Sequence, residues 1–257
     1  MIELDRLPFE TKDYEEQTEI KHKVFREYFD KWVKILGSAH KLNYVDGFAG
    51  LGAYHKNEKV YFGSPIIASD VINKNGKEAW LLFIDKDKSA IENLNSVIKF
   101  NGLDKLKNLK INVINQDFNE IMDELLNTKN IENAEPTFVF IDPFGFEGIH
   151  YETIKKIMQT IKKPEIIINF MFNSITRFLE KENLEDTFAK VFGTEDWKGR
   201  VGDEGEREKN IVDFYVSQLE DIKFRIPIQA DISRQKQNVL LSHSSYKASF
   251  RSFDYEI

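Results

Sequence analysis

Apolar residues recur with a helical period near the start of the chain. One row falls at steps of four and comprises Ile20, Val24, Tyr28, Trp32 and Leu36. This spacing predicts an amphipathic helix over residues 13–36, which ends at Gly37 and Ser38. Its broad apolar face is expected to pack against the rest of the protein.

Five short apolar runs follow this helix and alternate with segments of helical spacing. Each run is five or six residues long, and they occupy residues 42–46, 80–85, 109–114, 137–142 and 165–170. Runs that are almost continuous in apolar character are typical of parallel strands buried on both faces. Their alternation with helices predicts an α/β protein with a mainly parallel, doubly wound, Rossmann-like sheet.

The sequence pattern distinguishes three further regions of the chain, with no linker between them. Residues 42–170 are expected to form the core, residues 171–220 a helical region, and residues 221–257 closing strands and a tail. The two closing strands are expected at 223–228 and 238–243, antiparallel to the rest. No repeat or low-complexity tract interrupts the chain, so we expect a single domain over residues 1–257.

Composition and charge exclude several kinds of site. Apolar residues make up 41% of the 257 residues, and no cysteine is present. Disulfides, zinc–thiolate sites and cysteine nucleophiles are therefore excluded, and the five scattered histidines give no reason to expect a metal site. No run approaches the length of a membrane span and the acidic first residues are unlike a signal peptide, so we expect a cytoplasmic protein. Because the net charge is −7, a basic surface for nucleic acid is expected only as a local groove.

Acidic residues and glycines gather where the first four strands end. The segments are Asp46-Gly47-Phe48-Ala49-Gly50-Leu51-Gly52, Asp85-Lys86-Asp87, Asp117-Phe118 and Asp142-Pro143-Phe144. In a doubly wound sheet, ligands bind outside the carboxyl ends of the strands. Glycines let the backbone bend and approach a ligand closely. We therefore place the candidate site at these strand ends.

The groups at the strand ends match the parts of S-adenosylmethionine. Asp85 or Asp87 can accept hydrogen bonds from ribose hydroxyls, and Asp117 can accept from an adenine amino group beside the apolar Phe118. Asp46 can accept from the ammonium of an amino acid. Together they predict a site for adenosine joined to an amino acid. Two local alternatives stay open, namely that Asp87 is a helix cap and that Phe118 belongs to the core.

A nicotinamide cofactor is the main competitor for this site. Its fingerprint, G-x-G-x-x-G, opens directly into a helix whose N-terminus binds the pyrophosphate. Here the glycines run G-x-x-G-x-G from Gly47 to Gly52, and Asp46 would repel a pyrophosphate. The sequence therefore favours S-adenosylmethionine over NAD.

Six motifs occur in the order found in a known family. They are YVDGFAGLGAY, GSPIIAS, FIDKDKSAIENL, QDFNEIM, FIDPFGFEGI and INFMFNSITRF, and the similar region covers about residues 17–180. In these motifs the chain resembles the three-Cys-motif partner proteins (TcmP), which are regarded as methyltransferase-like. The resemblance implies a Rossmann-like class I methyltransferase fold, S-adenosylmethionine as cofactor, and a protein with a three-cysteine motif as partner.

The resemblance also implies roles for individual residues. The cofactor loop would consist of Asp46, Gly47, Phe48, Ala49, Gly50 and Gly52, with Ser64 and Pro65 opening the next helix beside it. The ribose would contact Asp85 and Asp87, the adenine Asp117 and Phe118, and the methyl group would be transferred near Asp142, Pro143 and Phe144. Residues 53–63 make the connection to Ser64 unusually long, which we interpret as a flap over the cofactor. Ser64 is expected to be the N-cap of its helix, with Pro65 in the first helical position.

Methyl transfer needs alignment of the acceptor and exclusion of water more than covalent help. Asp142 can hold the hydrogens of an amine and orient its lone pair, while Phe144 stacks on a planar substrate. Asn169, Asn173 and Arg177 follow strand five and are candidates for contacting a nucleobase or phosphate, or equally for pairing with nearby acids. We expect a methyltransferase that acts on a nucleic-acid base or another planar amine. A methyltransferase of a protein or small molecule, and a non-catalytic partner protein that keeps the fold, stay open as alternatives.

Overall fold

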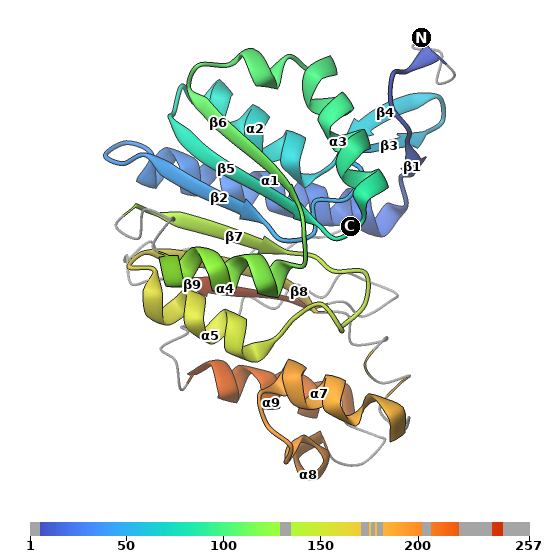
Figure 1. Ribbon diagram of the computed structural model, residues 1–257, viewed down its shortest axis with the longest axis vertical. Helices are drawn as coiled ribbons and strands as arrows, with labels where there is room; N and C mark the ends of the chain where they lie inside the picture. The colour runs from blue at the N-terminus through green and yellow to red at the C-terminus, as the bar shows by residue number, and fades with distance from the viewer. Residues whose placement is uncertain are drawn as a thin grey trace, which may run out of the picture.

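A six-stranded sheet forms the centre of the molecule (Figure 1). The computed structural model describes residues 6–128, 135–170, 175, 178, 182–201, 207–220 and 238–243. In the order β6-β5-β2-β7-β8-β9 the strands are β6 (Leu109–Asn115), β5 (Ala79–Asp85), β2 (Leu42–Asp46), β7 (Thr137–Ile141), β8 (Pro164–Phe170) and β9 (Asn238–His243). The first five are parallel and β9 is antiparallel to β8, which confirms the predicted sheet and the closing strand at 238–243. The strand expected at 223–228 lies outside the described residues.

Helices cover both faces of this sheet and complete two apolar cores. On one face lie α1 (Glu16–Leu36), α2 (Ser64–Lys74) and α3 (Lys88–Phe100), with the short η2 (Leu103–Lys105). On the other lie α4 (Phe118–Thr128), α5 (Tyr151–Thr160), α7 (Glu185–Phe192), α8 (Trp197–Val201) and α9 (Arg207–Glu220), with η3 (Glu182–Leu184) before α7. The four strands β5, β2, β7 and β8 are buried between these layers, as their nearly continuous apolar character requires, whereas β6 is partly exposed.

Aromatic packing fixes the N-terminal helix α1 against the sheet. Phe29 is fully buried, and its ring centroid lies 5.1 Å from that of Tyr44 and 4.9 Å from that of Phe138. Trp32 adds an edge-to-face contact with Phe138 at 5.2 Å. Aromatic pairs of this geometry add about 0.5–1.5 kcal/mol each beyond the area they bury. The position of α1 over β2 and β7 is therefore well determined, and it brings polar residues of α1 to the ends of these strands.

A small second sheet lies beside the carboxyl end of β2. It consists of β1 (Lys12–Asp13), β3 (Ala53–Lys56) and β4 (Lys59–Phe62), in the order β1-β3-β4. The hairpin between β3 and β4 turns at Asn57 and Glu58, whose φ angles of 49° and 60° lie in the left-handed region. The lengthened connection at 53–63, interpreted from the sequence as a flap, therefore forms a β-hairpin that β1 extends.

Candidate functional site

The order of the strands places a switch point between β2 and β7. From β2 the chain continues to β5 on one side, and later elements are added from β7 on the other. At such a point the loops that leave neighbouring strands diverge and open a crevice for ligands. The carboxyl ends of β2, β5, β6 and β7 carry Asp46, Asp85, Asp117 and Asp142, so the structure gathers the predicted acids along one edge of the sheet.

The glycine-rich loop after β2 is held by both neighbouring strands. The N–H of Gly47 donates to the carbonyl of Phe140 on β7, and the N–H of Ala49 donates to that of Ile84 on β5, both at 2.9 Å. Gly50 then donates its N–H to Oδ2 of Asp85 at 2.8 Å. The loop therefore crosses the switch point in a fixed path that links the ends of all three strands.

Two positions in this loop require glycine. Gly50 has a φ of 59°, and no atom lies within 4 Å of the place where a Cβ would stand. Gly52 has a φ of 81°, and a Cβ there would lie 2.6 Å from Cδ1 of Leu94 on α3. Glycine adopts such angles without strain. Gly52 thus serves packing against α3, whereas Gly50 leaves open space beside the carboxylate of Asp85.

The Asp85 carboxylate is oriented by two backbone amides. Besides the Gly50 contact, its Oδ1 accepts the N–H of Asp87 at 2.9 Å. Asp87 itself caps α3, because its Oδ1 accepts the N–H of Ser89 at 2.8 Å and that of Ala90 at 3.3 Å. The hydroxyl of Ser89 also donates to Oδ1 at 2.7 Å, and together with the two amides it holds the pKa of Asp87 below its ordinary value. Asp87 is therefore a helix cap, which is the alternative that the sequence left open. Of the two acids, Asp85 is the stronger candidate for contacting ribose hydroxyls.

The residues expected beside the adenine are also tied to local structure. Asp117 accepts the N–H of Asn119 at 2.8 Å and that of Glu120 at 3.3 Å, so its Oδ1 caps α4. Phe118 is only 2% exposed and belongs to the core. Its ring packs below Gly47, where a Cβ would lie 2.6 Å from it. Phe118 therefore supports the cofactor loop from beneath.

Asp46 is a fully buried carboxyl group at the end of β2. It accepts the hydroxyl of Tyr44 at 3.0 Å and the N–H of Phe48 at 3.3 Å, and it is hydrogen-bonded to the side chain of Ser64. Burial, with a smaller contribution from the charge of Asp142, raises the pKa of Asp46 to about 7 against the effect of these hydrogen bonds. The prediction that Ser64 is the N-cap of α2 is wrong by one residue, because Gly63 is the N-cap.

Asp142 accepts hydrogen bonds from side chains of two elements, α1 and β8. Nζ of Lys21 on α1 donates to both of its oxygens, at 2.9 Å to Oδ1 and 2.8 Å to Oδ2. The two side chains are 16% and 17% exposed, so the ion pair is largely shielded from water. The amide Nδ2 of Asn169 on β8 also donates to Oδ1. Sequence reasoning missed Lys21, which lies 121 positions from its partner.

Asn169 has one polar atom left over. The residue is 2% exposed, and its Oδ1 is buried with no hydrogen-bond partner among the described residues. Such an acceptor carries a desolvation cost of about 1–3 kcal/mol until a donor reaches it. Asn169 thus joins the site through Asp142 and leaves a carbonyl-type acceptor beside it.

The segment after Asp142 reaches the rim of the site. Pro143 is buried, whereas the Phe144 side chain is 85% exposed. Nζ of Lys12 on β1 lies 5.1 Å from the centroid of the Phe144 ring, which is cation–π distance. An aromatic ring held in solvent with a cation on it is available to a planar partner.

An aromatic group from β3 and the N-terminal segment lies over the same strand ends. His22 on α1 is 5% exposed, and its Nδ1 is hydrogen-bonded to the hydroxyl of Tyr14 at 3.1 Å. Burial lowers the pKa of His22 to about 4 despite the charge of Asp142, so this imidazole is neutral at pH 7. Burial and the charges of Asp142 and Asp46 raise the pKa of Tyr54. No pattern in the sequence pointed to Tyr14 or Tyr54, because nothing marked β3 or the two residues before Tyr14 as strands.

Some expectations fall outside these observations. Asn173 and Arg177 lie outside the described residues. Within the part of the chain that the structure describes, no group of three or more His, Asp or Glu side chains is arranged to hold a metal ion. No helix among the described residues combines the length and the apolar character needed to cross a membrane.

Comparisons with known proteins agree at the level of the fold. No protein-family model and no curated protein sequence matches the chain. Its structure is similar to that of the carbon methyltransferase DszA, with a TM-score of 0.55 and 13% identity over 90% of this chain and 55% of that one. It is also similar to a provisionally named O-methyltransferase from Klebsiella pneumoniae, with a TM-score of 0.50 and 10% identity over 95% of this chain and 87% of that one.

The strand order, the antiparallel last strand and the flanking helices agree with these similarities. The chain has the Rossmann-like fold of the class I methyltransferases.

Proposed function

We propose that the protein is a methyltransferase that uses S-adenosylmethionine. The observation that carries the proposal is Asp85, a strand-end carboxylate held by the amides of Gly50 and Asp87 beside an open glycine position. Each carboxylate oxygen keeps a lone pair for a ribose hydroxyl after accepting one amide. A carboxylate fixed in this way binds a diol without losing conformational freedom of its own.

The other groups fit the remaining parts of the cofactor. Asp46 would accept the ammonium of the methionine part, and the cationic cofactor would in turn favour its ionised form. Asp117 keeps Oδ2 for the adenine amino group, while its Oδ1 caps α4. Phe48, half-buried and 5.7 Å from Phe118 between ring centroids, would supply apolar contact to the base.

The acceptor would lie beside Asp142. The cofactor supplies an activated methyl group, so the protein needs to hold the acceptor lone pair in line with it and to exclude water. The hydrogens of an amine can be held by Asp142 and by the unpartnered Oδ1 of Asn169, which offer two acceptors next to each other. Phe144 at the rim would stack on the ring that bears the amine. This arrangement favours a nucleic-acid base or another planar amine as substrate.

The family resemblance supplies a second part of the proposal. The motifs shared with the three-Cys-motif partner proteins suggest a complex with a protein that carries a three-cysteine motif. A non-catalytic protein that keeps the fold would also retain the Asp85 geometry, but it has no need of the shielded Lys21–Asp142 ion pair. That ion pair favours an enzyme.

Calorimetric titration with S-adenosylmethionine and with its demethylated product tests the proposal, with NAD as control. We expect saturable binding of the first two, and a loss of about 10- to 100-fold in affinity in Asp85→Ala, because charge-assisted hydrogen bonds are lost. Asp104→Ala is a matched control, since Asp104 is an exposed acid in η2. Equal affinity in the wild type and Asp85→Ala would remove the ribose assignment, and a folded protein that binds neither compound would remove the proposed function.

A further inference from the structure

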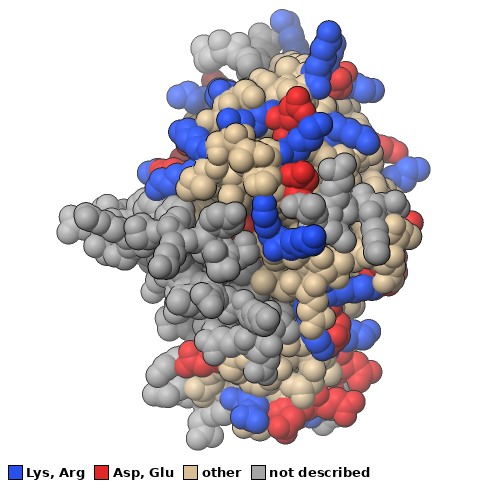
Figure 2. Space-filling model, turned by 90° about the vertical axis from the view of Figure 1, so that its left-hand side faces the viewer, with Lys and Arg blue, Asp and Glu red and all other residues tan. Residues whose placement is uncertain are grey.

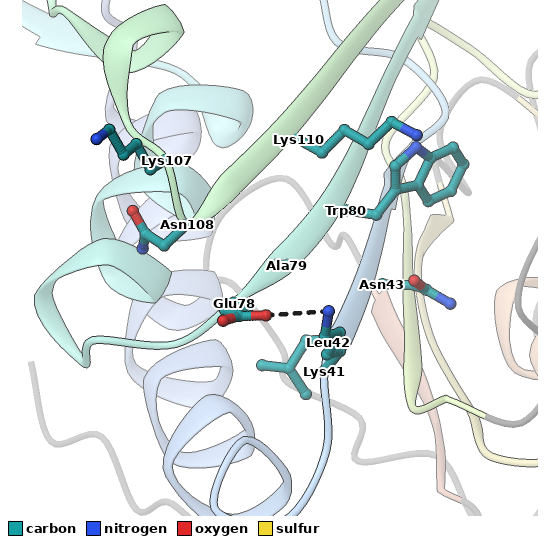
Figure 3. Close-up of a pocket in the computed structure, with 9 residues that line it drawn as sticks. All are labelled: Lys41, Leu42, Asn43, Glu78, Ala79, Trp80, Lys107, Asn108 and Lys110. Atoms are coloured by element: carbon teal, nitrogen blue, oxygen red, sulfur yellow. Dashed lines mark ion pairs between the residues drawn. The ribbon is translucent and has the colours of Figure 1, made fainter.

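A cavity opens at the amino ends of the strands, opposite the candidate site. It has a volume of about 300 Å³ and lies where β2, β5 and β6 begin (Figure 3). The first residues of the three strands stand in one row, since Leu42 pairs with Ala79 and Ala79 with Leu109. The cavity is thus separated from the candidate cofactor site by the length of β5, about 20 Å for seven residues.

Lysines surround this cavity although the chain as a whole is acidic. Residues 99–110 contain four lysines and one acidic residue, whereas the whole chain has a net charge of −7. Lys107 and Lys110 form no ion pair with any described residue, and Lys41 is paired with Glu78 at 3.1 Å. Figure 2 shows many Lys and Arg side chains over the upper half of the face on which the strands begin, with Asp and Glu side chains between them. The surroundings of the cavity therefore have a local positive potential, although the net charge of the chain is negative.

Trp80 adds an aromatic surface to the lysines. Its indole N–H donates to Oδ1 of Asn112 on the neighbouring strand at 2.9 Å, which fixes the ring across β5 and β6. Lys110 is the direct cross-strand partner of Trp80, and the two side chains lie at the same end of the cavity (Figure 3). Trp32 and Trp197 are 5% and 4% exposed, whereas Trp80 is only partly buried.

We propose that this cavity binds a single strand of nucleic acid, with a base on Trp80 and phosphates on Lys41, Lys107 and Lys110. Base–aromatic stacking beside a row of cations is the arrangement that single-strand-binding surfaces use. Lys41 precedes β2 and Lys107 precedes β6, two strand spacings or about 10 Å apart, so they suit successive phosphates better than one phosphate. An acidic peptide would use the lysines but leave the indole without a planar partner.

This site does not depend on the proposed methyl transfer. Binding of a strand can be measured without cofactor, so its failure and the failure of the proposed function are distinguishable. Where both hold, a strand bound here has about 20 Å to cover before it reaches Asp142, a span of a few nucleotides.

Fluorescence measurements on the full chain test the proposal. A short oligothymidylate of about eight nucleotides is titrated against the tryptophan emission, and a labelled copy against anisotropy at several salt concentrations. We expect saturable quenching in the wild type, and affinity about tenfold lower in Trp80→Ala because the stacked base is lost. In Lys107→Gln with Lys110→Gln, the slope of log affinity against log salt should fall by about 0.7 per lysine. Lys190→Gln is the control, an exposed lysine of α7 that should keep the wild-type slope.

Titrations with other ligands distinguish between the possible classes of ligand. An oligouridylate is expected to bind comparably, since stacking and phosphate contacts are common to both chains. Thymidine monophosphate that binds as tightly as the oligomer would replace the strand by a free nucleotide. Poly-glutamate that displaces the oligomer equally well, without a change in tryptophan emission, would replace it by an acidic peptide. Absence of binding by a folded wild-type protein, or an unchanged slope in the double lysine variant, would overturn the proposal.

Discussion

Two lysine–carboxylate ion pairs stand at the two ends of the central sheet. At the carboxyl end, Lys21 reaches both oxygens of Asp142 within 2.9 Å, and both side chains are about one-sixth exposed. At the amino end, Lys41 lies 3.1 Å from Glu78, and these side chains are 70% and 64% exposed. The chemical groups are of the same kind, but the first pair is shielded by α1 and β8 while the second stands in solvent.

The difference shows how one sheet can serve two kinds of ligand. Shielded carboxylates at the carboxyl end, Asp46 and Asp142, suit a cationic cofactor and an amine acceptor. At the amino end the carboxylate of Glu78 is screened by water, so the excess of lysines sets the local field. Burial thus decides whether a charge serves as a fixed chemical group or as part of a diffuse potential.

The largest expected effect concerns Asp142. In Asp142→Ala, methyl transfer to a nucleic-acid mixture should fall at least about 100-fold, because a preorganised acceptor for the amine is lost. The dissociation constant for S-adenosylmethionine should change little, since the ribose and adenine contacts remain. Transfer of labelled methyl groups and calorimetric titration measure the two quantities separately. Turnover that survives this substitution would show that Asp142 does not hold the acceptor.

The next effect measures the shielded ion pair directly. A double-mutant cycle with Lys21→Met and Asp142→Asn should give a coupling of about 1.5–3 kcal/mol in the free energy of unfolding, as expected for a shielded charge-assisted contact. Urea denaturation of the four proteins supplies the numbers. Lys21→Arg should recover part of the stability, since it retains the charge. A coupling near zero would mean that α1 does not deliver Lys21 to the site as described.

The buried carboxyl of Asp46 predicts a pH dependence of cofactor binding. Its pKa is raised to about 7, so only the ionised fraction, which grows with pH, can hold the ammonium. Affinity for S-adenosylmethionine should rise about tenfold between pH about 5.5 and 7, where an α-amino group stays protonated. The same shift predicts that the free energy of unfolding of the unbound protein falls as pH rises from about 4 to 7, because the unfolded chain releases its proton first.

Asp46→Asn is the variant that isolates this effect. It should flatten both the pH profile of cofactor affinity and the pH profile of stability, which calorimetry and urea denaturation report. A pH profile that persists in Asp46→Asn would assign the titration to another group.

The sequence predicted the sheet well because four of its strands, β5, β2, β7 and β8, are buried on both faces and therefore form apolar runs. The run at 42–46 coincides with β2, and the other four runs fall within one residue of their strands at either end. The hairpin of β3 and β4 gave no comparable signal, because its turn uses Asn57 and Glu58 rather than the Asn-Gly or Asp-Gly that marks a tight hairpin. Its side chains are only partly buried, so no apolar run reveals it.

The sequence predicted residues of the site only where those residues lie at the ends of strands. Asp46, Asp85 and Asp142 end apolar runs and Asp117 stands three positions after one, so the topology predicts that they lie along the same end of the sheet. Lys21 lies beside the apolar row of a helix, where a lysine ordinarily faces solvent, and its partner lies 121 positions away. Trp80 begins the apolar run at 80–85, which predicts a strand buried on both faces, whereas its neighbours Lys110 and Asn112 leave that part of the sheet partly exposed. The roles of Lys21 and Trp80 depend on contacts between segments that lie far apart in the sequence, and a local sequence pattern does not show such contacts.

The smallest expected effect completes the comparison of the two ion pairs. A double-mutant cycle with Lys41→Met and Glu78→Gln should give a coupling below about 0.5 kcal/mol in the free energy of unfolding, since exposed pairs are screened by water and salt. Glu78→Gln alone should strengthen binding of the oligothymidylate, because it removes a negative charge from the row of lysines. Urea denaturation and anisotropy report the two results on the same proteins. A coupling as large as that of Lys21 and Asp142 would show that exposure does not separate the two ends of the sheet.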